Sequence, residues 1–544
     1  MAVSLSFESL VAGALTAVVG QDEINALLIN SLVEKARTRP HPWSTHYPYI
    51  CWTGLTDRTY DARLLPAYPY PEVDAPKTRR PPIQDVVQLF EEPTGQQREC
   101  PKSTCLFPAF AQYLTDGFIR TRVSNPAPFH TFDDDRRRTT SNHDIDLSPL
   151  YGRTEAQTNV LRVKDPGQGQ KGRLKSQLIN GEEFPLYLFD QNGKMDPQFA
   201  DASGAAVLDW PLGLKERAPG KATIFAVGGD RANANPQVAM INTLFLREHN
   251  RLAGLLEKRF GAWDDERIFQ TARNVVIVMF IKIVVEEYIN HINTSLFKFI
   301  ANPQVAWHAK WNRPNWMTAE FGLLYRWHSL IPENFVLDGK TVNGVSLVLD
   351  NSLLINTGLA NTFVDISANN AAELGLQNSP SFLWQIEANS VLQARTNNIS
   401  TFNAYREAMS MDRVASFEEL VGESDDEPEN DRRRQLARRL EELYGDIDNL
   451  EFYVGLFAEP RVKNGPLPEL LMAMVAMDAF SQALTNPLLS EHVYGDPGNR
   501  ELAFTDLGLQ EIEATTCLKD ILARNSSGLG DRFVGMTRQD WHRE

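Results

Sequence analysis

The chain of 544 residues is poor in cysteine, with only Cys51, Cys100, Cys105 and Cys517. Four scattered cysteines do not make the disulfide framework of a secreted scaffold, and the spacing of Cys100 and Cys105 fits neither a zinc ribbon nor a redox CxxC pair. Basic residues are also in deficit, since 54 Lys+Arg against 70 Asp+Glu give a net charge of −16. With no broad basic stripe for phosphates, nucleic acid is excluded as a partner.

Long hydrophobic runs are missing as well. No segment reaches the roughly 18–20 uninterrupted apolar residues of a membrane span, and the longest run, 275–285, is broken by Lys282 and predicts a buried core helix. The apolar N-terminus carries Glu8 and lacks the basic flank of a secretory signal. The chain also has no repeats and no glycine-rich phosphate loop. We therefore expect a cytoplasmic protein, with at most peripheral contact to a membrane.

What is present indicates a large, mainly α fold. Hydrophobic residues are 42% of the chain, enough for an extensive core, and strand signals are few and short. We expect three parts: an N-terminal helical segment (1–40), an irregular wrapping segment rich in proline and tyrosine (41–100), and one large catalytic domain (101–544). Helical periodicity predicts helices over 22–37, 104–120, 236–260, 266–292 and 317–330, and a polar connection over 422–434 that leads into a helix ending near Tyr444.

The helix predicted over 22–37 has two interpretations. Its apolar residues recur at helical spacing and its other face is charged. Such a helix usually packs on its own domain. The alternative is a helix that lies on a lipid surface and admits a substrate from it.

Tyr325 and His328 stand three residues apart in AEFGLLYRWHSLIP (319–332), which predicts a helix that Pro332 ends. On one helix face, the imidazole could meet a planar cofactor and the phenol a substrate channel. Taken alone, this pair is more often a core residue and a cap.

Several longer segments change that assessment. STCLFPAFAQYLTDGFIRT (103–121), NHDIDLSPLYGR (142–153), LLYRWHSLIPENF (323–335) and RLEELYGDIDNLEFYVGLFAE (439–459) resemble the haem-dependent animal peroxidase–cyclooxygenase superfamily. Within it, IKIVVEEYINHI (281–292) is most similar to the cyclooxygenases. The resemblance runs in order from about residue 30 to 490. It implies a helical haem peroxidase-like fold, and without a secretory signal or the growth-factor-like module it favours a bacterial-type enzyme.

The resemblance also assigns residues around the haem. His328 matches the proximal ligand of the haem iron, and Tyr444 matches the tyrosine that hydrogen-bonds its imidazole. Trp327 matches a channel-lining position and is expected to help bind the cofactor. Tyr325 matches the tyrosine that becomes the substrate-oxidising radical, and Tyr288 matches the tyrosine that orients it.

The substrate channel is expected to include Leu324 and Ile289. Ser481, in AFSQ, matches the channel serine that aspirin acylates, and Arg37 matches the arginine that pairs with the fatty-acid carboxylate. The alternative for Arg37 is one more solvated charge. Ser295 stands where the family has a tyrosine at the channel's constriction, so the grip on the carboxylate is expected to differ.

The distal side of the haem departs from the family pattern. Gln112 keeps the family's glutamine, but Asp116 replaces the distal histidine, and Arg231 stands where peroxidases have an arginine. An ordinary aspartate, with a pKa of ~3.9, is a poorly matched base at neutral pH. Burial would raise that pKa, and Arg231 would oppose the rise. We therefore expect a feeble peroxidase whose oxygenase side is intact.

Two further family features concern cofactors. Thr115 and Ala234 stand at the positions of haem ester links and carry no carboxylate, so haem b is expected to be non-covalent. The peroxidase calcium loop corresponds to Asn142, Asp144, Asp146 and Ser148, which could ligate calcium, although Gly117 replaces the aspartate that completes the site. The alternative is a structural turn.

The resemblance thus implies a haem-dependent dioxygenase that takes an unsaturated fatty acid, O2 and a peroxide activator and forms a hydroperoxide through a tyrosyl radical. Linoleate-type acids, oleate and arachidonate all fit, and no oligomeric state is indicated. One alternative is a haem peroxidase or hydroperoxide-rearranging enzyme. The other is a haem-binding protein without turnover, which would have no need of the Tyr325 and Tyr288 pair.

Overall fold

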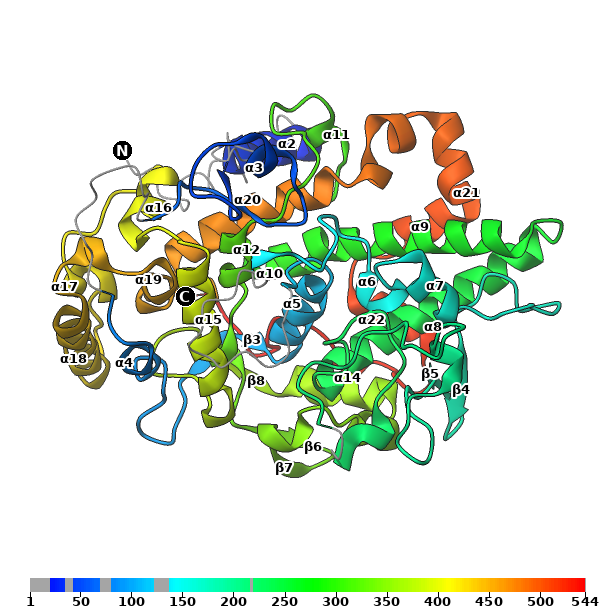
Figure 1. Cartoon of the computed structure of the whole chain (residues 1–544), viewed down its shortest axis with the longest axis horizontal. Helices are drawn as coiled ribbons and strands as arrows, with labels where there is room; N and C mark the ends of the chain where they lie inside the picture. Colours follow the sequence, from blue (N-terminus) through cyan, green and yellow to red (C-terminus); the bar gives the residue numbers. More distant parts are fainter. Residues whose placement is uncertain (1–19, 35–42, 69–79, 122–136, 216–218, 544) are drawn as a thin grey trace.

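The computed structural model of the protein describes residues 20–34, 43–68, 80–121, 137–215 and 219–543. Helices make up most of this part of the chain, and its strands are short (Figure 1). The predicted mainly α fold class is confirmed. The four cysteines are unpaired, as expected.

Three buried helices form the centre of the fold. α8 (Pro236–Arg259) and α9 (Asp265–Ile283) pack along each other, and α5 (Leu106–Asp116) packs on α8. The side chain of Asn235 caps α8 by accepting a hydrogen bond from the Val238 amide at 3.0 Å. The predicted helices are therefore present here, with ends shifted by a few residues.

The helix predicted over 266–292 is present but irregular. After α9 the chain forms a π-helical segment, η4 (Val284–Ile289), and then α10 (Asn290–Ile292). Such π-helical insertions occur often at functional sites, and this one carries Tyr288. The stretch 265–292 is long and apolar enough to cross a membrane, but 78% of its apolar window is buried in the protein. It is the predicted core helix.

The helix predicted over 317–330 is wrong in its second half. α12 (Ala319–Leu324) ends before Tyr325, and the short helix η5 (His328–Leu330) follows. Tyr325 and His328 therefore do not share one helix face. Tertiary contacts override the periodicity, because Tyr325 stacks on Trp327 with ring centroids 4.9 Å apart.

The N-terminal helix belongs to the main body. α2 (Gln21–Glu34) buries Ile24, Ile29 and Val33 and packs on α20 (Glu469–Leu484) (Figure 1). Asn25 bonds the backbone of residue 300 in both directions, at 3.1 Å each. Packing on its own domain is thus the correct interpretation for this face.

The wrapping segment is also pinned to the domain. Arg63 is fully buried and donates to the carbonyl oxygens of Ser44 at 2.8 Å and Asn397 at 3.1 Å. Its two short strands pair with each other, and Ala62 also forms a single bridge to Thr318. Among the described residues there are four antiparallel sheets, each of two strands. The pairs are β1 (Trp43–Ser44) with β2 (Ala62–Arg63), β3 (Glu99–Thr104) with β8 (Asn370–Ala372), β4 (Ser176–Ile179) with β5 (Glu182–Pro185), and β6 (Asn334–Leu337) with β7 (Lys340–Asn343).

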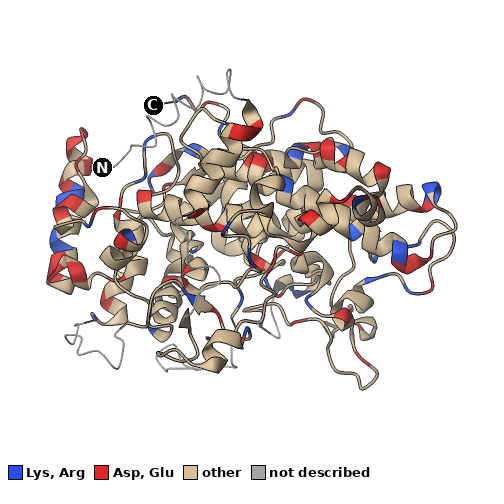
Figure 2. Ribbon diagram, turned by 90° about the horizontal axis from the view of Figure 1, so that it is seen from above, with Lys and Arg blue, Asp and Glu red and all other residues tan. Residues whose placement is uncertain are grey.

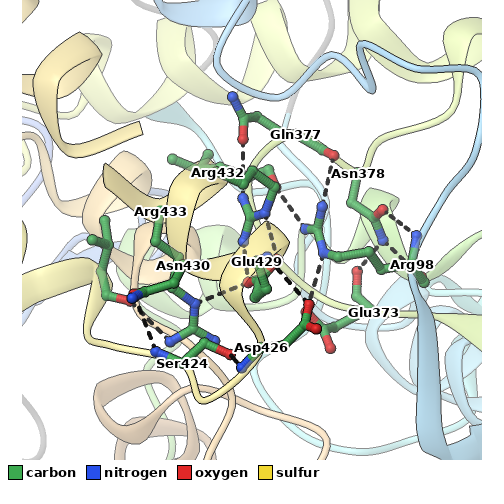
Figure 3. Close-up of polar contacts among 12 residues, drawn as sticks. Arg98, Glu373, Gln377, Asn378, Ser424, Asp426, Glu429, Asn430, Arg432 and Arg433 are labelled. Atoms are coloured by element: carbon green, nitrogen blue, oxygen red, sulfur yellow. Dashed lines mark hydrogen bonds and ion pairs between the residues drawn. The ribbon is translucent and has the colours of Figure 1, made fainter. Parts of the chain in front are cut away.

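The polar connection predicted over 422–434 is partly helical, because α18 (Glu427–Tyr444) begins inside it. Figure 3 shows why: Glu429 accepts from Arg432 and Arg433, one turn further on, and Arg432 donates to Gln377 Oε1 at 2.9 Å. The helix ends at Tyr444 as predicted. Figure 2 shows acidic and basic residues mixed over the outer helices rather than gathered into one basic face.

The remaining helices surround this centre. The segment after 490, for which the sequence indicates nothing, is well anchored: Arg524 and Asn525 donate to the buried carboxylate of Glu248 at 3.1 and 2.6 Å. The α-helices are α3 (Trp52–Thr56), α4 (Ile83–Val87), α6 (Ser148–Tyr151), α7 (Glu155–Leu161), α11 (Gln304–Trp307), α13 (Ser352–Thr357), α14 (Leu359–Ala368), α15 (Trp384–Thr396), α16 (Phe402–Ala408), α17 (Phe417–Val421), α19 (Phe452–Ala458), α21 (Pro497–Glu513) and α22 (Leu518–Asn525). The tighter or wider turns are η2 (Pro197–Phe199), η3 (Pro219–Thr223), η6 (Gly344–Leu347), η7 (Ser381–Leu383), η8 (Ile447–Asn449), η9 (Pro487–Leu489) and η10 (Glu491–Gly495).

Candidate active site

An aromatic cluster joins three elements at the centre of the molecule. The ring of Phe107, from α5, lies 5.6 Å from that of Tyr288 in η4 and 5.2 Å from that of Trp327. Tyr325 stacks on Trp327 and lies 4.7 Å from Phe321. Packing thus brings together the two tyrosines and the tryptophan that the resemblance assigned.

Tyr325 and Tyr288 influence each other directly. Burial raises the pKa of the Tyr325 phenol, the Tyr288 hydroxyl opposes that rise, and the nearby carboxyl of Asp478 adds to it. Burial and Tyr325 raise the pKa of Tyr288. Neither hydroxyl makes an aligned hydrogen bond within the described structure. Both phenols therefore keep their protons at neutral pH, which hydrogen-atom chemistry at Tyr325 requires.

His328 presents one ring nitrogen to a carboxylate. Its Nδ1 lies 3.1 Å from Oε1 of Glu387, whereas no described residue hydrogen-bonds Nε2. The prediction that Tyr444 bonds this imidazole is wrong. The Tyr444 hydroxyl donates to Glu451 Oε2 at 3.0 Å, and Glu451 is held there by Arg395.

The sequence interpretation missed Glu387 and Tyr453. The Tyr453 hydroxyl donates to Glu387 Oε2 at 2.6 Å, so this tyrosine is linked to His328 through the carboxylate. Tyr453 lies in the same family-like block as Tyr444, nine residues later. That block signals a tyrosine beside the imidazole without deciding between the two. Nothing in the sequence points to Glu387.

Several buried polar groups around His328 fit a planar anionic cofactor. Trp327 Nε1, Arg326 Nε and Arg231 Nε make no aligned hydrogen bond to any described residue. Burial and the positive charge of Arg231 lower the pKa of Arg326 to about 10, so two guanidinium groups lie near each other. With Nε2 of His328 for the iron and two cations for the carboxylates, the residues present fit haem.

The positions of haem ester links hold no carboxylate in the structure either. The Thr115 hydroxyl is buried and donates to the Ala111 carbonyl at 2.9 Å. Ala234 has an apolar side chain. Non-covalent haem b accordingly stays our prediction.

On the distal side, Gln112 is half-buried and its Oε1 accepts from Asn235 Nδ2 at 3.3 Å. Asp116 is almost fully buried, and its oxygens make no aligned hydrogen bond among described residues. Its nearest cation is Arg120, whose Nε lies 3.9 Å from Oδ1. Burial raises the pKa of Asp116 to about 6, and Arg120 opposes the rise more than Arg231 does. The sequence interpretation named Arg231 and missed Arg120.

We expect Asp116→Asn to remove a pH dependence of stability. The folded protein binds the Asp116 proton more tightly than the unfolded chain does, because the pKa rises from 3.8 to about 6. The contribution of this group to the free energy of unfolding is therefore fully present below pH 3.8 and is lost, by about 3 kcal/mol in all, as the pH rises through about 6. Urea unfolding at pH 4.5 and 7 should show about 2 kcal/mol of that fall, because the rest is already lost by pH 4.5. Asp531→Asn, at an exposed carboxylate, is the control, and equal pH dependence in Asp116→Asn and the unmutated protein would contradict the argument.

The structure describes the predicted channel residues apart from one. Leu324 and Ile289 are buried beside the aromatic cluster. Ser481 is buried in α20, where its hydroxyl donates to the carbonyl of Asp478 at 3.0 Å. Arg37 lies outside the described residues. Asp478, a fully buried carboxyl close to Tyr325, was not predicted.

The Ser295 position and the predicted calcium loop form local turns. Ser295 Oγ accepts from the Phe297 amide at 3.2 Å. In the loop, Asp146 accepts from Asn142 and from the Ser148 amide at 2.5 and 2.8 Å. Asp144 instead accepts from Asn315 at 3.3 Å, and the Ser148 hydroxyl donates to the Gly117 carbonyl at 3.0 Å. Within the described ranges, no three His, Cys, Asp or Glu side chains are grouped to share a metal ion. These hydrogen bonds are those of a structural turn, and calcium binding stays a prediction.

Comparisons with known proteins place this site in a family. A model of the family described as animal haem peroxidase matches residues 117–534. Prostaglandin G/H synthase 2 of Bos taurus is 29% identical over 518 residues, covering 92% of this chain and 76% of that protein. Among solved structures, Peroxidase A from Dictyostelium discoideum has a TM-score of 0.65 at 18% identity and covers 88% of this chain and 96% of its own. A fatty acid alpha-dioxygenase of Oryza sativa with palmitic acid has a TM-score of 0.64 at 16% identity, covering 95% and 93%. The chain belongs to the animal haem peroxidase family, as a cyclooxygenase-like member of it.

Proposed function

We propose that the protein is a haem-dependent dioxygenase that converts an unsaturated fatty acid and O2 into a hydroperoxide through a radical on Tyr325. The observation that carries the proposal is the juxtaposition of Tyr325 and Tyr288 in one buried aromatic cluster, whose Trp327 directly precedes His328 in the chain. The resemblance to a prostaglandin G/H synthase and the fold shared with a fatty acid alpha-dioxygenase support it.

Haem bound at His328 Nε2 would supply the one-electron oxidation, driven by a peroxide, that starts the reaction. Tyr325 then acts on the substrate. Its phenoxyl radical takes a hydrogen atom from an allylic C–H bond and becomes a phenol again, which leaves a carbon radical. O2 adds to that carbon, and the resulting peroxyl radical takes the hydrogen back from Tyr325. The products are a hydroperoxide and the regenerated phenoxyl radical.

The protein positions the Tyr325 ring and surrounds it with apolar side chains. Tyr288 and the stacked Trp327 fix the Tyr325 ring, and buried Leu324 and Ile289 are apolar neighbours for an acyl chain. We propose that the place of the chain beside Tyr325 decides which carbon is oxygenated. Pairing of the carboxylate with Arg37 remains part of the proposal.

A second candidate function is peroxidase or hydroperoxide-rearranging activity. The half-buried Gln112 and the cation Arg231 favour it, since both are groups that stabilise a peroxide. Asp116 disfavours the ordinary peroxidase because it replaces the distal histidine, although burial brings its pKa to about 6, nearer to that of a useful base. With guaiacol and hydrogen peroxide, we therefore expect turnover far below that of a dedicated peroxidase.

Product analysis tests the proposed function. Haem-loaded protein is incubated with linoleate, oleate, arachidonate or palmitate and a trace of lipid hydroperoxide, and the products are identified by mass spectrometry. We expect hydroperoxides of the unsaturated acids that carry both atoms of ¹⁸O2. Rearranged products without new ¹⁸O would support the second candidate instead.

We also propose peripheral contact with a lipid surface. Leu27 on α2 and Trp52 on α3 expose 65% and 78% of their surface, and Ile50 is exposed beside Trp52. Replacing Leu27 and Trp52 together by serine should weaken binding to liposomes roughly 10-fold or more, since each buried apolar side chain contributes about 1.5–3 kcal/mol. Flotation measures this. Leu178→Ser, at a leucine that is 77% exposed on β4, is the matched control; binding that is equal in all variants, or absent in the unmutated protein, would refute the proposal.

A further inference from the structure

Glu387 is a fully buried carboxylate in contact with the proposed iron ligand. It lies in α15 and is 1% exposed. Its Oε1 comes within 3.1 Å of His328 Nδ1. The ring N–H does not point at this oxygen closely enough to count as a hydrogen bond, so the contact is a close approach of the two groups. Burying a carboxylate costs free energy unless its oxygens accept hydrogen bonds. The other contacts of Glu387 therefore show what stabilises it in this position.

Two hydroxyl groups hold Glu387 in place. Ser379 donates to Oε1 at 2.7 Å, and Tyr453 donates to Oε2 at 2.6 Å. Tyr453 is itself fixed by packing, with its ring 5.4 Å from that of Phe90. Because both oxygens accept hydrogen bonds from residues that are themselves fixed, the carboxylate is oriented independently of His328.

A cation also lies within electrostatic range of Glu387. Arg326, two residues before His328, interacts with the charge of Glu387 and donates to Gln393 Oε1 at 2.9 Å. This guanidinium partly compensates the charge of the buried carboxylate. Glu387 is thus surrounded by two hydroxyl donors and a nearby guanidinium group.

We propose that Glu387 is the positioning residue of His328: it holds the proton on Nδ1, presents Nε2 to the iron, and makes the imidazole a stronger electron donor. This inference rests on His328 as the iron ligand. A charged acceptor pulls the Nδ1 proton more strongly than a phenol does, and a more basic imidazole stabilises ferric over ferrous iron. With a neutral tyrosine as its partner, such as the Tyr444 predicted from the sequence, the imidazole of His328 would be a weaker electron donor to the iron.

The test replaces Glu387 by glutamine, which keeps the shape and removes the charge. For haem-loaded Glu387→Gln we expect a more positive Fe(III)/Fe(II) potential by spectroelectrochemistry, and a lower iron–imidazole stretching frequency by resonance Raman. We also expect haem affinity to fall about 10- to 100-fold. Glu387→Asp should recover part of the potential.

Two controls separate this role from structural damage. Glu320→Gln alters a similarly buried carboxylate, which accepts from the Tyr405 hydroxyl at 2.6 Å and the Leu64 amide at 2.8 Å. It should leave the potential and the stretch unchanged. Tyr453→Phe should shift both, because it removes a hydrogen bond that orients and tunes the carboxylate, while Tyr444→Phe should shift neither. This pair keeps the test decisive if Glu387→Gln does not fold.

The outcomes are distinct. A potential and stretch that stay the same in Glu387→Gln and Tyr453→Phe, with haem still on His328, would overturn the role of Glu387 alone. Haem that keeps its affinity and spectrum in His328→Ala would instead overturn the ligand assignment of the proposed function, and the inference with it.

Discussion

Tyr325→Phe should abolish oxygen uptake with linoleate while haem content and fold stay unchanged. The substitution removes one hydroxyl and keeps the ring stacked on Trp327, 4.9 Å away. The loss should be at least about 100-fold, because misplacement of a reacting group by 1 Å already costs that much. Oxygen-electrode rates for the two proteins, at equal haem content, measure it.

The matched control for this variant is Tyr288→Phe. It removes the hydroxyl that influences Tyr325 but leaves Tyr325 able to form the radical. We expect reduced oxygen uptake and a less selective product pattern. Electron paramagnetic resonance after peroxide treatment should show a tyrosyl signal that Tyr325→Phe changes. Undiminished oxygen uptake in Tyr325→Phe would show that another group attacks the substrate.

His328→Ala should lose haem binding and, with it, all oxygenase activity. Haem that binds only the folded state stabilises it by about 2.7 kcal/mol when its free concentration is 100 times Kd. We expect the unmutated protein to gain this stability on haem addition and His328→Ala to gain much less. Thermal unfolding with and without haem, followed by the visible spectrum, measures the difference.

Free imidazole offers a sharper check on that variant. His328→Gly leaves room for imidazole, which should restore the haem spectrum if His328 acts only as a ligand. His308→Ala alters a histidine whose side chain is 83% exposed and should behave like the unmutated protein. Haem-induced stabilisation of equal size in the unmutated protein, His328→Ala and His308→Ala would show that another residue is the iron ligand.

Local sequence signals predicted the long helices well. α8 (Pro236–Arg259) follows an N-cap asparagine and begins with a proline, and α18 ends before Gly445, which adopts a positive φ of 73°. These features act within a few residues. The break of α12 before Tyr325 was not predictable in this way, because Trp327 and Gln393 hold residues 325 and 326 out of the helix through tertiary contacts.

The site residues fall into the same two groups: those indicated by local motifs and those whose contacts depend on the tertiary structure. The resemblance indicated Tyr325, Tyr288 and His328, since their motifs are local in the chain. It misassigned the partner of His328 because Glu387 comes from a helix nearly 60 residues further along, whose sequence carries no signal of its own. The ion pair of Asp116 with Arg120, four residues on, fits the helical spacing of the predicted helix 104–120, but the family pattern directed the assignment to Arg231 instead.

Simultaneous measurement of O2 uptake and hydroperoxide tests the central claim most directly. Haem-loaded protein receives linoleate and a trace of lipid hydroperoxide in an oxygen electrode, and the hydroperoxide is assayed over the same period. A Tyr325-dependent dioxygenase consumes one O2 for each new hydroperoxide. The O2 consumed and the hydroperoxide formed should therefore rise together, and both should far exceed the hydroperoxide added at the start. Loss of the added hydroperoxide without O2 uptake would contradict the account and identify hydroperoxide metabolism instead.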